Sequence, residues 1–472
     1  MEQDNQKTSI RFTKMSFFSI VALLLGLIIF VGILTFVIPA GHYVSDENGN
    51  ITTNFVFEAA KNRLPVYRWF TSPFEVWFSE NGLTLIFLSL LLLIMAGTFY
   101  VIDKTGGMQA IINAIICKFS KYRYTLIWVT IFFFMLMAAV FGTFEDGLIL
   151  LSIVMIMCKA MKWDNLTALG MMLLAAGVGL SCTLMNFFSI GLASQLAGTN
   201  VLTGIWLRII VWLVMWVITS IFVINAFAKK AEKRNIEQGI ACDRDAVLKE
   251  IGVITLEEKK KVTVFSLFFL SVFAIIIFTY LVSDLVDYIM PIMCVAFLSG
   301  SIICNYILTK NHKTFFKNFG KGAFAIAPAI LILMMSLSIK YIAEKGEILQ
   351  SIFYYFSELT ARTGPYAAII LIYSTISIFN FFIPSSSSKI VILIPLLTLF
   401  PIEGISKELI VLAFVLSEGF YDVFFPTSPV LLIGLSFAGV SYLTWFKKTV
   451  LFQGLILIIS FAVLMFGVAI KY

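Results

Sequence analysis

The chain alternates long apolar stretches with short polar segments, and this pattern predicts helices that cross a membrane. One crossing of the hydrocarbon core takes about 20 apolar residues. Seven clear runs of this kind occupy 16–38, 83–101, 204–227, 262–283, 285–307, 322–340 and 447–470. Two further stretches, 124–200 and 365–440, are apolar but interrupted by polar, Gly and Pro clusters. We therefore expect an all-α polytopic membrane protein with about nine to twelve membrane segments.

The composition supports this class of protein and excludes others. The 472 residues are 60% apolar and 13% charged, with a mean hydropathy of +0.98. Soluble proteins are about 45–50% apolar and about 25% charged, so a soluble enzyme, a disordered chain and a nucleic-acid-binding protein are excluded. Because no small-residue cleavage signal accompanies residues 16–38, we interpret them as a retained first helix rather than a signal peptide.

Few residues of the types that hold metals or cofactors are present. The two histidines, His42 and His312, fall near predicted membrane ends, and the six cysteines are scattered. No HExxH motif, CxxC pair or Walker A motif occurs in the sequence. We therefore expect no metal and no cofactor, and the sequence disfavours transport driven by ATP hydrolysis.

The distribution of Lys and Arg predicts the orientation, because short cytoplasmic loops carry an excess of these residues. The N-terminal segment has Lys7, Arg11 and Lys14, and the long loop 228–261 is strongly basic. The loop 41–82 is instead rich in acidic residues. These charges predict a multi-pass protein of the cell membrane with a cytoplasmic N-terminus and a C-terminus outside.

The two interrupted stretches resemble each other in design. Each contains a polar tip followed by a partner segment with a polar break; the tips are 141–147 and 383–389, and the breaks are 181–186 and 422–429. A constant offset between the two stretches aligns Phe141 with Phe382 and Asn186 with Thr427, and the flanking loops carry opposite charge. Such inverted repeats are typical of secondary transporters.

This correspondence predicts two inverted repeats, 1–227 and 262–472, joined by the cytoplasmic linker 228–261. Each repeat should contain one re-entrant hairpin and one broken helix. Non-helical backbone at membrane depth has to be buried in protein or line a wet cavity. Its free carbonyls can hold a cation, and the amide ends of its half-helices can hold a carboxylate. We therefore expect a binding cavity near the membrane midplane.

Hydroxyl and amide side chains at the tips and breaks are candidates for binding the substrate. The run of Ser385, Ser386, Ser387 and Ser388 could capture a carboxylate, although small residues also allow two helices to pack closely. The polar residues of the two breaks could each bind substrate or ion, or could simply cap the half-helices; they are Asn186, Thr427 and Ser428.

Four carboxylates within apolar stretches complete the candidate site: Glu145, Asp146, Glu418 and Asp422. A charged residue at the centre of a membrane helix costs on the order of 2.5–3.5 kcal/mol. Lys389 is the nearest cationic residue in these motifs, so acid exceeds base. This excess suits a cationic substrate, a proton or Na⁺ better than a dicarboxylate. Alternatively, Lys389 pairs with one carboxylate and another lies at a membrane edge.

Several motifs resemble the YfcC family, which sits with the anaerobic C4-dicarboxylate carriers in the wider ion-transporter superfamily. They are Thr35–Tyr43 with Ile-Pro-Ala-Gly, Gly177–Ser181 with Asn186-Phe187, Pro384–Lys389, Pro426–Ser428 and Ala438–Val440. The resemblance implies a scaffold and a mobile transport domain that work as an elevator, often in a homodimer. It also implies either an arginine/ornithine antiporter or a C4-dicarboxylate carrier. The sequence departs from the pattern at Phe187, Ser388 and Asp422, where proline, glycine and an uncharged polar residue are expected.

We therefore predict a secondary transporter that exchanges basic amino acids, most simply arginine for ornithine, by alternating access. Ser385–Ser388 and Asn186 would hold the α-carboxylate, and the acidic residues would hold the cationic groups. The alternative is a Na⁺- or H⁺-coupled carrier of C4-dicarboxylates or other carboxylates, in which Lys389 helps to bind the anion. An enzyme is not expected: Tyr421-Asp422 resembles the YD pair of intramembrane aspartyl proteases, but the second aspartate in a GxGD motif is absent. The expected partners are the small-molecule substrate and the lipid bilayer.

Overall fold

Helices form almost all of the protein in the computed structural model. The structure describes residues 14–45, 51–58, 64–79, 82–107, 110–111, 113–114, 122–142, 144, 147–237, 255–282, 285, 288–309, 312–360, 362–383, 386–399, 402 and 404–472. Within them, eight helices are long and apolar enough to cross a membrane, or nine if the bent pair α15–α16 counts as one span. Eight is one fewer than the predicted minimum of about nine, and nine equals that minimum.

The first half of the chain contains two long helices with a β-hairpin between them, followed by a series of interrupted helices. The two long helices and the elements between them are α1 (Lys14–Val37), β1 (Gly41–Ser45), β2 (Ile51–Phe57), α2 (Val66–Glu75), the 3₁₀ turn η1 (Val76–Phe78) and α3 (Gly82–Lys104). The following elements are α5 (Arg123–Phe141), α6 (Gly147–Ala160), α7 (Asn165–Leu169), the π-helical turn η3 (Gly170–Leu174), α8 (Ala175–Ser181), the π-helical turn η4 (Phe187–Gly191), α9 (Leu192–Ala197), α10 (Ile205–Val223), the π-helical turn η5 (Ile224–Ala228) and α11 (Lys229–Glu237).

All the regular elements among the described residues of the second half are helices. Its elements are α13 (Leu256–Leu281), α14 (Ile289–Thr309), α15 (His312–Ile326), α16 (Pro328–Lys345), α17 (Ile348–Thr360), α18 (Pro365–Phe382), α19 (Ser386–Leu399), α20 (Lys407–Phe424), α21 (Pro429–Ala438) and α22 (Tyr442–Ala469). Capping residues set several of these starts: Ser406 and Ser441 each accept a bond from a backbone N–H of the first turn.

Three features differ from the sequence prediction. The fold is not purely helical, because β1 and β2 pair antiparallel, with Gly41 opposite Phe57. The segment 322–340 is not one straight span, since α15 ends at Ile326 and α16 starts at Pro328 after a 41° bend. Proline lacks a backbone N–H and fits best in the first turn of a helix, so it starts α16 instead of continuing α15. The helix α17 was also not predicted.

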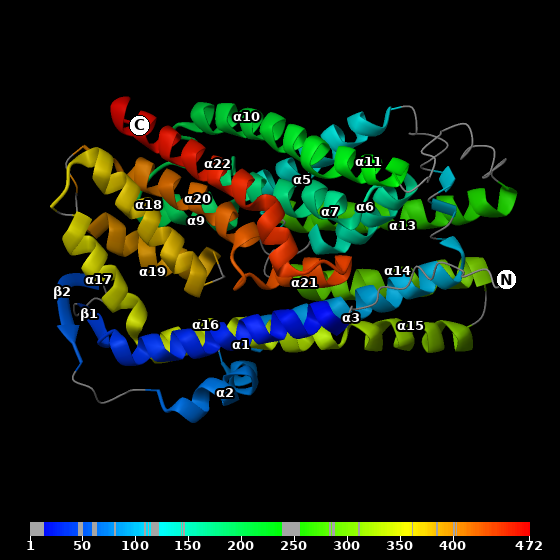
Figure 1. Ribbon diagram of the computed structural model, residues 1–472, viewed down its shortest axis with the longest axis horizontal. Helices are drawn as coiled ribbons and strands as arrows, with labels where there is room; N and C mark the ends of the chain where they lie inside the picture. Colours follow the sequence, from blue (N-terminus) through cyan, green and yellow to red (C-terminus); the bar gives the residue numbers. More distant parts are fainter. Residues whose placement is uncertain are drawn as a thin grey trace.

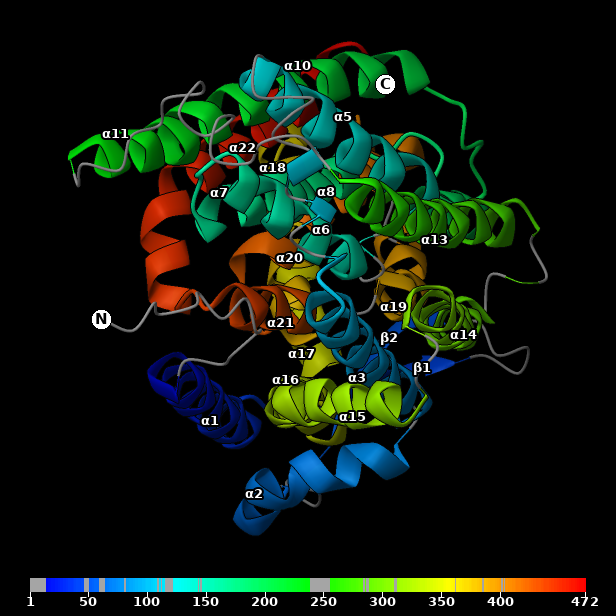
Figure 2. The same cartoon turned by 90° about the vertical axis from the view of Figure 1, so that its right-hand side faces the viewer.

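The helices pack in two side-by-side groups. On one side, α3 packs against α15 and α1 against α16, with α2 outside them, as Figure 2 shows. On the other side lie α5, α10 and α22, and the short helices α8 and α21 lie between the groups together with the longer α20 (Figure 2). Every residue of α8 is buried, whereas only 33% of the apolar window of α22 is buried. The exposed apolar side chains of α22, such as Leu451 and Ile458, are suited to contact lipid.

Helix bounds in the two halves correspond at the offset found in the sequence. Phe141 ends α5, and its counterpart Phe382 ends α18. Gly198 and Gly439 are separated by the same interval, and both end a short helix in the left-handed conformation, with φ of 69° and 66°. Left-handed φ at such a position is typical of a glycine C-cap. The offset therefore relates local structures as well as residues.

Helices α5 and α18 start at opposite ends of the molecule. At the start of α5, Arg123 and Tyr124 both contact Glu232 of α11. At the start of α18, Pro365 lies against Gly404, and Ser406 two residues on donates a hydrogen bond to the carbonyl of Tyr472. In Figure 1, α11 and the C-terminus lie toward opposite ends of the long axis. We call these the Glu232 end and the Tyr472 end.

Candidate functional site

A buried lysine forms the centre of the candidate site. Lys389 is the fourth residue of α19 and is 1% exposed. Its Nζ donates a hydrogen bond of 2.6 Å to Asn380 Oδ1 of α18 and lies 3.7 Å from Glu418 Oε1 of α20. The ammonium also stands 4.9 Å from the ring centroid of Tyr421, which is within cation–π range. Side chains from α18 and α20 therefore surround the positive charge that α19 carries.

The carboxylate that faces Lys389 is held by the first half of the chain. Ser189 in the π-helical turn η4 donates a hydrogen bond of 2.6 Å to Glu418 Oε2. A second hydrogen bond orients the Asn380 amide, because its Nδ2 donates a bond of 2.9 Å to the carbonyl of Ser417. Asn380 Oδ1 therefore faces the ammonium. The site thus joins both halves through one carboxylate.

Asp422 adds a second buried acid to the cluster. It lies one helical turn after Glu418 on α20, is 9% exposed, and interacts electrostatically with Lys389. Like charges four residues apart on a helix repel each other, so the shared ammonium of Lys389 stabilises both acids. In their ionised forms, the two carboxylates exceed the single ammonium by one negative charge.

Two glycines allow α8 and α20 to approach closely beside this cluster. A Cβ on Gly419 would lie 1.7 Å from the carbonyl oxygen of Gly177 and 2.4 Å from Ser181 Oγ. A Cβ on Gly177 would in turn lie 2.3 Å from Val423 Cγ1. Neither position has space for a side chain. The close approach fixes α20, and hence Glu418, against the end of α8.

The break in the second half lies where the sequence predicted it. Helix α20 ends at Phe424 and α21 starts at Pro429. Ser428 accepts a bond from the backbone N–H of Leu431, so it acts as the helix cap. The carbonyl of Thr427 accepts a 2.6 Å bond from Ser336 Oγ of α16, while Thr427 Oγ1 is buried without a hydrogen-bond partner.

The break in the first half is held by backbone contacts and an arginine. Helix α8 ends at Ser181, and the N–H of Leu184 donates 2.9 Å to the carbonyl of Ala139 in α5. Arg208 of α10 is 2% exposed and donates 3.0 Å to the carbonyl of Leu184. Asn186 is 2% exposed and lies against Gly142, where an added Cβ would stand 2.6 Å from Asn186 Nδ2.

The structure places the predicted site residues in three groups. Lys389, Glu418 and Asp422 come together in one cluster. Asn186, Thr427 and Ser428 lie at the two helix breaks, and only Ser428 is explained by capping. Ser386 is half-buried at the start of α19, and the side chains of Ser387 and Ser388 lie outside the described part of the chain. Glu145, Asp146 and Ser385 lie outside the described residues altogether.

Sequence reasoning missed three residues that shape the site. Asn380 and Arg208 are polar residues within apolar runs, and such residues are functional candidates by default in a membrane protein. The same criterion that identified the acids, a polar residue within an apolar run, would have identified them. Ser189 carries no such signal, because a serine in an apolar helix usually bonds to its own backbone. Only the fold brings it to Glu418.

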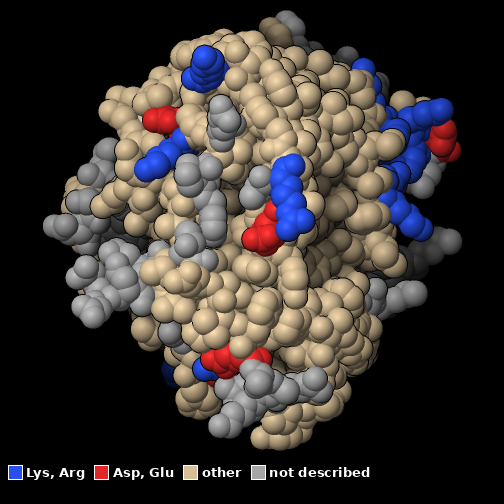
Figure 3. All heavy atoms as spheres, turned by 90° about the vertical axis from the view of Figure 1, so that its left-hand side faces the viewer, with Lys and Arg blue, Asp and Glu red and all other residues tan. Residues whose placement is uncertain are grey.

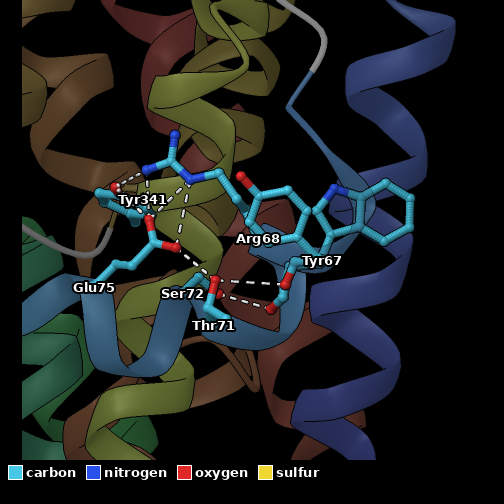
Figure 4. Close-up of polar contacts among 7 residues, drawn as sticks. Tyr67, Arg68, Thr71, Ser72, Glu75 and Tyr341 are labelled. Atoms are coloured by element: carbon cyan, nitrogen blue, oxygen red, sulfur yellow. Dashed lines mark hydrogen bonds and ion pairs between the residues drawn. The ribbon is translucent and has the colours of Figure 1, made fainter.

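A second polar cluster, between α2 and α16, holds α2 in place. Figure 4 shows Arg68 and Glu75 of α2 together with Tyr341 of α16. The Arg68 guanidinium donates to Glu75 and, at 2.9 Å, to the Tyr341 hydroxyl, which donates 2.9 Å to Glu75 Oε2. These bonds, that from Arg68 above all, lower the pKa of Glu75 to about 2. The cluster is partly exposed and docks α2 onto α16.

No group of metal ligands marks a further site in the described part of the chain. There, no three His, Cys, Asp or Glu side chains gather closely enough to hold a metal ion. On the face that shows the Tyr472 end, most Lys, Arg, Asp and Glu side chains lie in separate places, and a larger group of Lys and Arg lies at the right edge of the view (Figure 3). The buried Lys389 cluster is therefore the strongest candidate site.

Many apolar membrane helices around a buried charged cluster define a multi-pass membrane protein of the transporter class. The family described as DcuC, C4-dicarboxylate anaerobic carrier, matches residues 17–469. The chain belongs to this family, and the resemblance to YfcC-like carriers predicted from its motifs is confirmed. The protein is therefore a membrane transporter of the DcuC/YfcC family.

The individual relatives share about a quarter of their residues with this chain. The chain is 26% identical to the protein of Escherichia coli (strain K12) named "Putative basic amino acid antiporter YfcC", over 92% of this chain and 94% of that protein. It is 25% identical to an uncharacterized protein of Haemophilus influenzae, over 78% of this chain and 72% of that protein.

Two solved transporter structures are similar at low sequence identity. The Alcanivorax borkumensis YdaH transporter is 13% identical, with a TM-score of 0.42, and the match covers 97% of this chain and 98% of that one. Neisseria gonorrhoeae MtrF is 14% identical, with a TM-score of 0.43 and 94% coverage of both chains. Sequence identities and TM-scores this low support no conclusion about the site of this protein.

Proposed function

We propose that the protein is a secondary transporter that exchanges basic amino acids, arginine for ornithine, by alternating access. The observation that carries this proposal is the buried cluster of Lys389, Glu418 and Asp422. In its ionised form the cluster has a net charge of minus one. Arginine and ornithine each have a net charge of plus one at neutral pH, so either substrate neutralises it.

Charge neutrality gives a physical reason for exchange. A loaded site is neutral and can move past apolar surfaces, whereas an empty site would carry an unpaired buried charge. The cost of an unpaired charge in a low-dielectric interior is several kcal/mol, which slows the return of the empty carrier. The site therefore returns only with another cation bound. The name of the E. coli relative agrees with this substrate class.

We propose that the two halves, 1–227 and 262–472, are inverted repeats joined by the linker 228–261. The shared offset of helix ends and the start of α5 and α18 at opposite ends of the molecule support this arrangement. The pairs α5–α6 and α18–α19 would be the re-entrant hairpins of an elevator-type carrier. The Glu232 end would face the cytoplasm and the Tyr472 end the outside. We propose a homodimer, as the family resemblance implies.

Within this carrier, Glu418 and Asp422 would bind the cationic groups of the substrate, with Glu145 and Asp146 as further candidates. The α-carboxylate would bind at Ser385–Ser388 and Asn186. The unpaired hydroxyl of Thr427 is a further polar group at the second break. Each assignment uses a residue type that matches the charge or the hydrogen-bonding capacity of its ligand.

The test is uptake of labelled arginine into proteoliposomes with and without internal ornithine. We expect uptake only with internal ornithine, and a loss of at least tenfold in the variants Glu418→Gln and Asp422→Asn. A matched control is Glu358→Gln, because Glu358 lies exposed in α17 and pairs with Arg362. Normal arginine affinity in both site variants would contradict the proposal.

The second candidate is a Na⁺- or H⁺-coupled carrier of C4-dicarboxylates, which the family description favours. In it, the acids would bind the coupling ions and Lys389 would help to bind the anion. A dicarboxylate adds two negative charges to a site that already has one in excess, so at least three cations would have to accompany it. Succinate uptake driven by a Na⁺ or proton gradient, without exchange of arginine, would select this alternative.

A further inference from the structure

The ammonium of Lys389 pairs with Glu418 without a direct hydrogen bond to it. Glu418 Oε2 is fixed by Ser189 at 2.6 Å, but Oε1 has no hydrogen-bond partner although it is buried. The ammonium stands 3.7 Å from Oε1, beyond hydrogen-bond distance, and instead bonds to Asn380 at 2.6 Å. One oxygen of a buried carboxylate is therefore neutralised by charge alone.

Lysine is suited to such an arrangement. Its ammonium is a compact point charge on a flexible four-carbon stem, so it can withdraw or approach without moving the helix. Arginine, with its planar fork, would bind the carboxylate through two bonds and close the oxygen off. Asn380 and Tyr421 give the Lys389 ammonium contacts that do not depend on Glu418.

We propose that Lys389 is a tethered cation that occupies a monovalent-cation position between Glu418, Asn380 and Asp422. In the wild-type protein this internal charge replaces a dissolved Na⁺ or K⁺, and so it determines that exchange is independent of such ions. This inference rests on the proposed function for its transport consequence, but the cation position itself does not depend on the identity of the substrate.

Removal of the ammonium should make the site dependent on a dissolved monovalent cation. Without Lys389, the two acids carry a net charge of minus two, and a cationic amino acid neutralises only one of these charges. A monovalent cation from solution must then bind for the loaded site to become neutral. The oxygens of Glu418 and Asn380 that now face the ammonium would face that cation, and oxygen ligands suit hard cations.

The first measurement is thermal unfolding of the purified full-length protein in NaCl, KCl or choline chloride at equal ionic strength. We expect Lys389→Ala to be stabilised by Na⁺ or K⁺ over choline by about 2–5 °C, in a saturable manner. The wild type should show no difference. The double variant Lys389→Ala/Glu418→Gln should also show none, because it restores the original net charge.

The second measurement is exchange in proteoliposomes with the same salts on both sides. We expect the rate of Lys389→Ala to fall at least tenfold in choline and to recover in Na⁺ or K⁺, while the wild-type rate changes less than twofold. The matched control is Lys340→Ala, because Lys340 is also buried and pairs with Glu344 at 3.4 Å on α16. This control should gain no cation response.

The two measurements separate this inference from the proposed function. If the wild type exchanges no basic amino acid but Lys389→Ala is still stabilised by Na⁺ or K⁺, the tethered cation stands and the substrate assignment fails. If Lys389→Ala shows no cation response in unfolding, the inference is wrong whatever the substrate. Failure of Lys389→Ala to fold in any of the salts overturns it as well, because no dissolved cation then replaces the ammonium.

Discussion

The contact between Gly177 and Gly419 allows a quantitative prediction about the site. The perturbation is Gly419→Ala, which adds one methyl group at the closest approach of α8 and α20. The new Cβ would lie 1.7 Å from the Gly177 carbonyl oxygen, and real Cβ atoms essentially never come within 3.0 Å of another heavy atom. The two helices must therefore separate until the new Cβ stands at least 3.0 Å from that oxygen.

Both stability and binding should suffer from this separation. Overpacking of a well-packed interior costs about 1–3 kcal/mol, and a clash with backbone cannot be relieved by a rotamer change. We expect a loss of about 3 kcal/mol and a fall in Tm of about 5 °C or more. Glu418 precedes Gly419, so the shift also stretches the 2.6 Å bond from Ser189, and the KM for the exchanged substrate should rise.

The assay is thermal unfolding in detergent together with exchange in proteoliposomes. The matched control is Gly454→Ala in α22, where an added Cβ meets no atom within 4 Å. Alanine favours a helix over glycine by about 1 kcal/mol, so this control should be as stable as the wild type or slightly more stable. A Gly419→Ala variant with wild-type Tm and KM would refute the close approach on which the site geometry depends.

Two further predictions concern single polar contacts. The pKa of Glu75 is about 2, below its usual value of 4.5, so its bond to Arg68 stabilises the protein above pH 4.5 and is lost as the pH falls toward 2. Because the pair is partly exposed, we expect its contribution to the free energy of unfolding to be only about 1 kcal/mol. The measurement is urea unfolding at pH 7 and at pH 3. The wild type should lose this contribution at pH 3, and Glu75→Gln should remove that difference between the two pH values. Ser189→Ala leaves a buried oxygen of Glu418 without its hydrogen-bond donor and should lower the stability by about 1–3 kcal/mol, measured by thermal unfolding. The control is Ser299→Ala, because the Ser299 hydroxyl is exposed and bonds within α14. This control should lower the stability by less than about 0.5 kcal/mol.

Much of the helical framework could be predicted from apolar runs alone. The run 16–38 became α1 and the run 447–470 became part of α22, because a membrane helix needs no signal other than length and hydrophobicity. The polar breaks were also predictable: α8 ends at Ser181 and α20 at Phe424, close to the expected positions. What the pattern could not predict is the β-hairpin β1–β2, which lies in a polar loop without strict alternation.

The charged residues of the site were predictable individually, but not their pairing. Lys389 and Glu418 lie in different predicted segments of the second half and could each have bound substrate alone. The structure pairs them at 3.7 Å, and the second acid, Asp422, is buried beside the pair instead of exposed. It also adds Ser189, which precedes Glu418 by almost half of the chain. Contacts between distant segments depend on how the two halves pack, and no local pattern encodes that.

The proposed correspondence between the halves would account for the position of the described charges in the second half. At the offset that aligns Phe141 with Phe382, Glu418 corresponds to Gly177 and Asp422 to Ser181, so the first half presents small residues where the second presents acids. These small residues are the ones that let α8 approach α20, since a Cβ on Gly177 would strike Val423. Two copies of the acidic version would place four carboxylates in one contact, and like charges at that distance repel strongly. Under the proposed repeat, the second half supplies the acids and the first half supplies the space beside them, so a single buried acidic cluster forms instead of two.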